Sequence, residues 1–221
     1  MKITFLLAAM LLAGLAQGAS QADFDRQMSY DGLQPVKVKG ISLAYRRPGA
    51  TLAGYRRVKL DPVDVRFDKN WNPTRTGTRL PLGAAEREAI RSDLAKLVQE
   101  QFEKALSAKG GYPLVSESGP DVLRLGIHVV NLYINAPDAG AAGPSYSFVT
   151  SAGEMTLFME IFDSESGQIL ARVVDRQHAR SPNMANMANR VTNVGEAADI
   201  TAAWARILRD AFDRAHGAMK N

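Results

Sequence analysis

The stretch MTLFMEIFDSESGQILARVVDRQH, residues 155–178, decides the fold, because it predicts a pair of neighbouring strands. Residues 155–162 are strongly β-prone, and a second β-prone run follows at residues 169–178. Between them stands Asp-Ser-Glu-Ser-Gly, residues 163–167, a short polar loop that ends in glycine. Loops of this length with a late glycine commonly close antiparallel hairpins. We therefore expect a β-hairpin here.

The hairpin has a predicted neighbour on its N-terminal side, a long β-rich run at residues 122–134. Before it, residues 84–109 show helical spacing of apolar side chains, and Gly110-Gly111 supplies the stop. The apolar stripe of this helix consists of Ile90, Leu94, Leu97, Val98, Phe102, Ala105 and Leu106. A helix with one apolar stripe needs a flat surface to cover, most simply a sheet.

A second helix is predicted near the end of the chain, with Asp199 as its N-cap. Trp204 lies on its apolar stripe, so we expect this side chain to be buried.

The remaining segments are expected to be shorter elements. Alternating patterns predict strands at residues 36–45, 58–60 and 63–68, and shorter strands are expected at 112–116 and 148–150. Irregular structure is expected at residues 23–34, 69–83 and 182–195. The predicted fold class is α+β, with two helices packed on one face of a mixed, mainly antiparallel β-sheet.

The N-terminus has the layout of a secretory signal peptide. Lys2 is followed by an apolar run of about 14 residues, too short for the roughly 20 residues of a spanning helix. Small residues at Ala16 and Gly18 favour cleavage before Ala19. Leu12-Ala13-Gly14 is the lead-in of a bacterial lipoprotein signal, but Leu15 stands where the lipid-carrying cysteine would be. The chain has 0 cysteines, so a lipid anchor on sulfur is excluded.

Removal of 18 residues leaves 203, enough to bury a large core without disulfides. The predicted organisation is a signal peptide at 1–18, a basic lead-in segment with a short strand at 19–55, and a single α+β domain at 56–221. No later apolar run is long enough to span a membrane. We expect an exported, periplasmic protein that is not lipid-anchored and could associate peripherally with the outer membrane.

The charge distribution marks one candidate contact zone. The formal net charge is +4, yet no acidic residue occurs between Asp31 and Asp61. The basic segment between them contains Lys37, Lys39, Arg46, Arg47, Arg56, Arg57 and Lys59. These cations are either a solvated strand face and loop or a contact zone for an anionic envelope polymer, a lipid surface or an envelope protein. No nucleic-acid partner is expected.

A second candidate contact is the long loop at residues 69–83. Trp71, with Arg75 and Arg79 nearby, could stack on a sugar ring or on a partner's surface. The alternative is that the tryptophan closes over the protein's own core.

The sequence offers no specific catalytic constellation. It contains no metal-ligand spacing among its 3 histidines, no phosphate-binding glycine loop and no nucleophile elbow, and we expect neither a metal nor another cofactor. His128 lies in a predicted strand and is expected to be a buried sheet histidine. The densest polar cluster is Asp175, Arg176 and His178 at a strand end. It could edge the pocket of an envelope hydrolase or transferase, or it could be a solvated strand end with cross-strand ion pairs.

Three stretches resemble a family of bacterial envelope proteins known as domain of unknown function 3313. They are AYRRPGATLAGYRRVKLDPVDVRF (44–67), GPDVLRLGIHVVNL (119–132) and TSAGEMTLFMEIFDSESGQILARVVDRQHA (150–179), followed by the Trp204 helix. Many relatives carry a lipobox cysteine, and this chain departs from them there. The resemblance implies an exported location and a fold, but no activity and no catalytic residues. We therefore expect a non-enzymatic binding module of the cell envelope, with the envelope hydrolase or transferase as the alternative.

Overall fold

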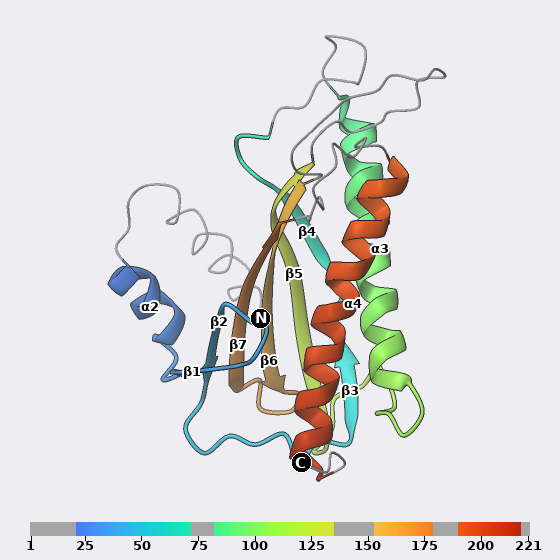
Figure 1. The fold of residues 1–221 in the computed structure, drawn as a ribbon. Coiled ribbons are helices and arrows are strands. Elements are labelled where there is room, and N and C mark those ends of the chain that lie inside the picture. Colours follow the sequence, from blue (N-terminus) through green and yellow to red (C-terminus); the bar gives the residue numbers. More distant parts are fainter. Residues whose placement is uncertain (1–20, 72–81, 135–152, 179–189, 218–221) are drawn as a thin grey trace.

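A computed structural model describes residues 21–71, 82–134, 153–178 and 190–217. Its centre is a seven-stranded mixed sheet with the order β1-β2-β7-β6-β5-β3, in which β4 also pairs with β5 (Figure 1). The strands are β1 (Gln34–Val36), β2 (Leu43–Arg46), β3 (Arg57–Leu60), β4 (Asp64–Phe67), β5 (Val122–Ile134), β6 (Gly153–Asp163) and β7 (Ile169–His178). Only β3 and β4 run parallel to their partner β5. The predicted α+β class is confirmed.

The predicted hairpin is the pair β6 and β7. Glu160 lies opposite Arg172, and the pairing extends from Glu154 opposite His178 to Phe162 opposite Ile169. In the turn, the Asp163 carboxylate accepts hydrogen bonds from the backbone N–H and the hydroxyl of Ser166. Gly167 has a φ of 68°, a left-handed conformation that glycine adopts without steric cost. Local turn chemistry therefore fixes the register of the hairpin.

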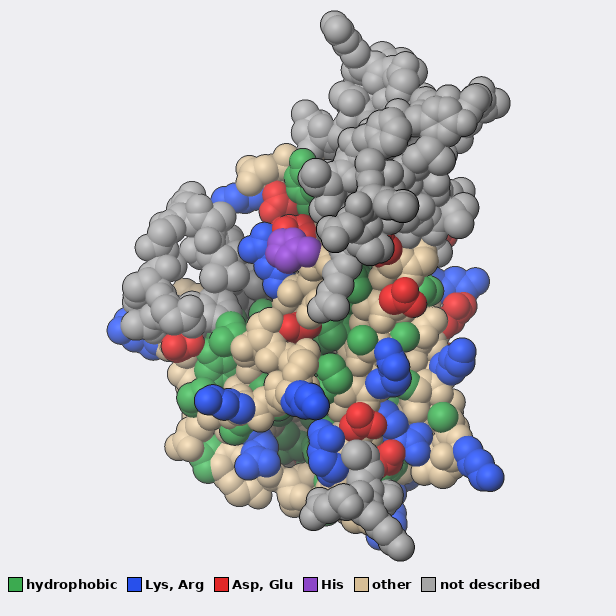
Figure 2. Space-filling view, in the orientation of Figure 1, with side chains coloured by type: hydrophobic (Ala, Val, Ile, Leu, Met, Phe, Trp, Pro, Cys, Tyr) green, Lys and Arg blue, Asp and Glu red, His purple; other side chains and the backbone are tan. Residues whose placement is uncertain are grey.

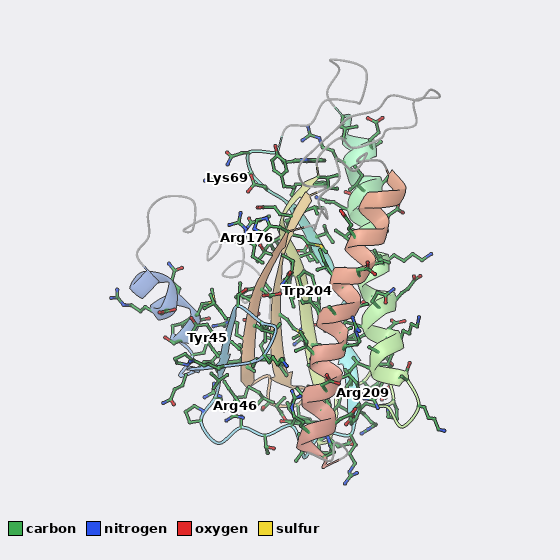
Figure 3. All side chains as sticks on the ribbon, in the orientation of Figure 1. Tyr45, Arg46, Lys69, Arg176, Trp204 and Arg209 are labelled. Carbon is green, nitrogen blue, oxygen red and sulfur yellow. The ribbon has the colours of Figure 1, made fainter. Side chains whose placement is uncertain are left out.

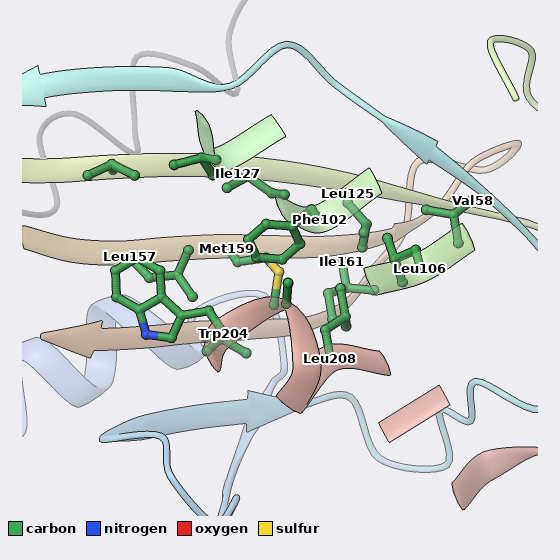
Figure 4. Packing of buried hydrophobic residues seen from close by; sticks show 14 of the residues in the cluster. Val58, Phe102, Leu106, Leu125, Ile127, Leu157, Met159, Ile161, Trp204 and Leu208 are labelled. Carbon is green, nitrogen blue, oxygen red and sulfur yellow. The ribbon is translucent and has the colours of Figure 1, made fainter. Parts of the chain in front are cut away.

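Two helices, α3 (Ala84–Ser107) and α4 (Arg190–Ala215), lie side by side on one face of the sheet (Figure 1). Their stripes and the inward side chains of β5, β6 and β7 form the main core, where Phe102, Met159 and Trp204 meet (Figure 4). Trp204 is buried, as its place on the stripe predicts. At the shared C-terminal end, the Arg209 guanidinium donates to the carbonyl oxygens of Ala105 and Leu106, at 3.1 and 3.3 Å. A cation at this position complements the helix dipole and ties α4 to the end of α3.

The third described helix, α2 (Gln21–Ser29), lies on the opposite face of the sheet (Figure 1). This segment overlaps residues 23–34, where irregular structure is expected, so that expectation is wrong for its first half. Met28 is fully buried in a second cluster with Tyr45, Phe158 and Val174. The polar sequence of this segment shows no clear helical period. The helix is stabilised by tertiary contacts instead.

Three other boundaries differ from the prediction. The strand expected at 36–45 is divided into β1 and β2, because the chain turns at Gly40 (φ 82°) and crosses toward α4. The second helix begins at Arg190, so Asp199 lies inside it and is not its N-cap, and the irregular structure expected at 182–195 is wrong for residues 190–195. The strand expected at 112–116 is reduced to an isolated bridge between Leu114 and Val58. The strand expected at 148–150 lies outside the described residues.

No helix within the described ranges combines the length and apolarity needed to cross a membrane.

Candidate functional site

The basic segment runs from one edge of the sheet to the other, and its seven cations have different surroundings. Arg47 is half-buried and donates from Nε to the Ile169 carbonyl at 2.7 Å and from Nη2 to the Asp31 carbonyl at 3.0 Å. Arg57 forms a fork with the carboxylate of Asp121. These two arginines are used within the fold, where they hold β2 and β3 to neighbouring segments.

Lys37, Lys39 and Arg46 are exposed, and the structure as described records no ion pair for them. The alternation of the β1–β2 connection explains the exposure of Lys37 and Lys39, because Val38 and Ile41 pack toward the main core. Gln34 pairs with Arg46, so Lys37 lies about three residues, or ~10 Å, along the edge from Arg46. The three cations therefore belong to one edge of the sheet.

Helix α4 brings a fourth cation to this edge. A Cβ built on Gly40 would lie 3.1 Å from Cδ1 of Ile207, so the connection that carries Lys39 touches α4. The preceding residue, Arg206, is exposed, and its only recorded hydrogen bond is a 3.2 Å contact to the Ala202 carbonyl. We call Lys37, Lys39, Arg46 and Arg206 the cationic edge. Lys and Arg side chains predominate over acidic ones in the lower half of the surface that Figure 2 shows, and Arg46 lies in the lower part of the molecule in the same orientation (Figure 3).

Arg206 could not be found from the sequence, because it stands 147 residues after Lys59, the last cation of the basic segment. The close approach of Gly40 to Ile207 creates the neighbourhood. The remaining cations lie toward the other edge of the sheet. Arg56 is exposed, and Lys59 is half-buried opposite Arg124, whose guanidinium pairs with the Asp61 carboxylate at 2.8 Å.

Trp71 packs against its own chain. Its ring stacks on Phe67 with centroids 4.0 Å apart, its Nε1–H donates to the Ile134 carbonyl at 3.0 Å, and the Arg87 guanidinium lies over it. Trp71 is buried, so its ring does not face solvent. Arg75 and Arg79 lie outside the described residues, and a contact role for this loop stays a prediction.

The strand-end cluster of Asp175, Arg176 and His178 is divided by the sheet. Asp175 faces α4 and is buried, where its Oδ1 accepts from the N–H and hydroxyl of Ser42, at 2.9 and 2.6 Å. Its Oδ2 accepts from Trp204 Nε1 and Gln177 Nε2, both at 2.7 Å. Four donors stabilise this buried carboxylate, and they join β2, β7 and α4.

Arg176 and His178 lie on the opposite face from Asp175 and share the carboxylate of Glu154. Arg176 Nη2 donates to both oxygens of Glu154 at 2.8 Å, and His178 Nδ1 lies 3.2 Å from Oε2. Figure 3 places Arg176 near the upper end of the sheet. This is a cross-strand ion pair at a strand end, one of the two alternatives that the sequence leaves open.

The three histidines lie at three separate places. His128 is buried in β5, and its Nδ1 lies 3.5 Å from Asp64 Oδ2. That contact, followed by the nearby Arg66 guanidinium, lowers the pKa of Asp64 against the opposing effect of burial. His216 Nδ1 lies 2.8 Å from the Phe212 carbonyl and 3.3 Å from the Tyr112 hydroxyl. No group of three or more His, Asp or Glu that could hold a metal ion occurs in the described segments.

The sequence matches the family model described as "Protein of unknown function (DUF3313)" over residues 21–208. The chain belongs to the DUF3313 family. The match begins at the first residue of α2 and contains all the described strands, so this DUF3313 unit includes both edges of the described sheet.

Solved structures with similar shapes are distant from this DUF3313 chain. A PelC dodecamer from Paraburkholderia phytofirmans is 9% identical, with a TM-score of 0.38; the likeness covers 80% of this chain and 96% of that one. Protein XCC0632 from Xanthomonas campestris is 13% identical, with a TM-score of 0.40 and 72% and 87% coverage. No curated protein matches the sequence. The family description supplies no activity.

Proposed function

We propose that this DUF3313 protein is an exported, non-enzymatic module that binds an anionic surface of the cell envelope through the cationic edge. The observation that carries the proposal is the exposure of Lys37, Lys39, Arg46 and Arg206 without ion pairs in the described chain. The signal-peptide pattern at residues 1–18 supports the location.

The magnitude favours weak, reversible attachment. Each basic residue beside an anionic membrane contributes at most about 1 kcal/mol. Four such residues give at most about 4 kcal/mol, which corresponds to a dissociation constant no lower than about 1 mM. Salt shortens the range of these interactions to about 8 Å at physiological ionic strength, so attachment should weaken as salt rises.

The proposal leaves catalysis out because the polar residues considered for it do not converge. Asp175 lies on one face of the sheet and the Arg176–His178 pair on the other. Each histidine has its own, different neighbours. A catalytic pair must lie within hydrogen-bond reach of one reacting atom.

The test is co-sedimentation of the mature chain with vesicles of phosphatidylglycerol and phosphatidylethanolamine. A variant with Lys37→Glu, Lys39→Glu, Arg46→Glu and Arg206→Glu should stay in the supernatant. The matched control carries the same change of net charge on and just after α3, at the exposed residues Arg91, Lys96, Lys104 and Lys109.

We expect the wild type and the α3 control to sediment at low salt and to be released as salt rises. Equal loss in both variants would mean that net charge alone drives attachment. Sedimentation that ignores salt, or that survives reversal of the cationic edge, would overturn the proposal.

A further inference from the structure

A β-bulge near the end of β5 changes which side chains face each side of the sheet. Against β6, the register passes from Val130 opposite Thr156 to Tyr133 opposite Glu154, three residues on β5 for two on its partner. Against β4, it passes from Val65 opposite Val129 to Phe67 opposite Leu132, with the same difference. The register against β4 and the register against β6 therefore both place one extra residue in β5. Asn131 lies within it, with a φ of 52°, the only described non-glycine residue with positive φ.

The bulge directs Tyr133 away from the main core. Before it, odd-numbered residues of β5 such as Ile127 and Val129 pack under α3 and α4. After it, Leu132 and Ile134 take the core-facing positions. Tyr133 consequently lies on the opposite face, where its side chain is 40% exposed. Bulges are frequent where a side chain is re-aimed next to a functional site, and left-handed non-glycine residues cluster at such sites.

Tyr133 stands in a polar row that crosses three strands. It is directly opposite Glu154, which is directly opposite His178. Arg176 and His178 are 59% and 61% exposed, and both contact Glu154. No hydrogen bond or ring contact engages the Tyr133 side chain within the described residues. We call Tyr133, Glu154, Arg176 and His178 the strand-end platform. In the upper part of the surface that Figure 2 shows, a histidine lies among acidic and basic side chains.

A further cation lies beside the platform. The Asp68 N–H donates to the Leu132 carbonyl at 3.0 Å, so the exposed Lys69 that follows is next to the bulge. Figure 3 places Lys69 and Arg176 on the same side of the upper sheet. The Asp68 carboxylate is used locally, because it accepts the Asn70 N–H at 2.7 Å. Lys69 therefore adds a second cation beside Arg176, and each of the two has a carboxylate close by, Asp68 and Glu154.

We propose that the strand-end platform binds a sugar ring of an acidic saccharide. An exposed aromatic face suits the apolar C–H face of a pyranose, and its hydroxyl adds a polar handle. Arg176 commits one nitrogen to Glu154 and keeps other donors for a sugar carboxylate. Glu154 and His178 can hydrogen-bond sugar hydroxyls. The guanidinium donors that Arg176 keeps, together with the nearby Lys69 ammonium, favour the carboxylate of an acidic sugar over a neutral hydroxyl.

The platform is separate from the cationic edge. Arg46 pairs with Ala171 near the start of β7, whereas His178 ends that strand seven residues later, ~23 Å away in an extended strand. The inference therefore stands or falls independently of the proposed attachment to an anionic surface.

The test is calorimetric titration of the mature chain with trigalacturonate, with maltotriose as the neutral probe. We expect binding of trigalacturonate only, weakened about tenfold by Tyr133→Ala and by Arg176→Ala, and largely kept by Tyr133→Phe, which preserves the ring. The controls are Tyr30→Ala, a 54% exposed tyrosine elsewhere, and Arg91→Ala, an exposed arginine paired with Glu88 on α3.

Folding of every variant is checked by circular dichroism, and Arg176→Ala, at an exposed side chain, tests the platform if Tyr133→Ala does not fold. The quadruple reversal at the cationic edge should bind trigalacturonate like the wild type. The proposal is overturned if the wild type does not bind trigalacturonate, if maltotriose binds equally well, or if the control and platform variants weaken binding alike.

Discussion

At the scale of single residues, Arg172 is a charge buried in the sheet. Its side chain is 2% exposed, and its guanidinium donates to Glu160 Oε1 at 2.8 Å, to Asp31 Oδ2 at 2.7 Å and to the Met28 carbonyl at 2.7 Å. The first partner belongs to the hairpin and the other two to α2 and the residues after it. One side chain thus connects the N-terminal segment to the centre of the sheet.

Replacing this arginine with a residue of similar volume should be costly. Arg172→Met leaves Glu160 and Asp31 partly buried without their cation, which costs about 3–5 kcal/mol of the free energy of unfolding. Urea unfolding followed by circular dichroism measures the loss. Arg91→Met breaks the exposed pair with Glu88 and should cost less than about 1 kcal/mol. Equal effects of the two substitutions would contradict this assignment.

Tyr55 gives a prediction at alkaline pH. Burial first, and then the hydrogen bond to Asp163, raise its pKa from 10.0 to about 12. The folded state holds this proton more tightly than the unfolded state, so the stabilisation is fully present below about pH 10 and is lost between about pH 10 and about pH 12. Tyr55→Phe has no such proton to lose. Its free energy of unfolding should therefore fall less steeply over that range, as urea titrations at several pH values would measure. A slope unchanged by the substitution would contradict the prediction.

At the scale of elements, sequence patterns predict those helices and strands whose formation depends on residues close together in the chain. The hairpin and α3 were predictable because their turn residues and apolar stripe follow one another in the chain. Helix α2 was not predictable, because it is held in place by hydrogen bonds from Tyr45 and Arg172, which come later in the chain. Arg206 could not be assigned to the cationic edge from the sequence for the same reason, because a contact between distant segments brings it there. The bulge in β5 was not predicted, because residues 122–134 are β-prone throughout and no local signal marks the extra residue.

The bulge of β5 can be tested through Asn131. Its φ of 52° is tolerated by asparagine and glycine, whereas a β-branched side chain there is a steric outlier. Asn131→Gly should change the free energy of unfolding by less than about 1 kcal/mol, because glycine offsets its larger loss of backbone entropy by relieving strain. Asn131→Val should lower it by about 1–3 kcal/mol. Urea unfolding distinguishes the two, and a valine variant as stable as the glycine variant would show that the bulge is not strained.

At the scale of the whole molecule, the two proposed surfaces lie near opposite ends of β7. Their separation of ~23 Å along an extended strand exceeds the screening length of about 8 Å at physiological salt. Charge on one surface therefore has little effect on binding at the other. A protein of this shape could contact an anionic surface and a saccharide chain together without coupling between the two sites.

Both proposals require export, which the leader predicts. The wild-type chain, expressed from Met1, should appear in the periplasmic fraction with a new N-terminus at Ala19, because the apolar run is too short to remain as a spanning helix. Leu15→Cys restores the cysteine that would follow Leu12-Ala13-Gly14 and should move the protein to the membrane fraction through a lipid anchor. Leu15→Ser is the matched control, since it is polar and of similar size to cysteine but cannot be acylated on sulfur. Full-length wild-type protein that sediments with inner membranes or stays in the cytosol would remove the basis for an envelope role. Equal fractionation of the cysteine and serine variants would instead show that residues 12–14 do not form a functional lipoprotein lead-in.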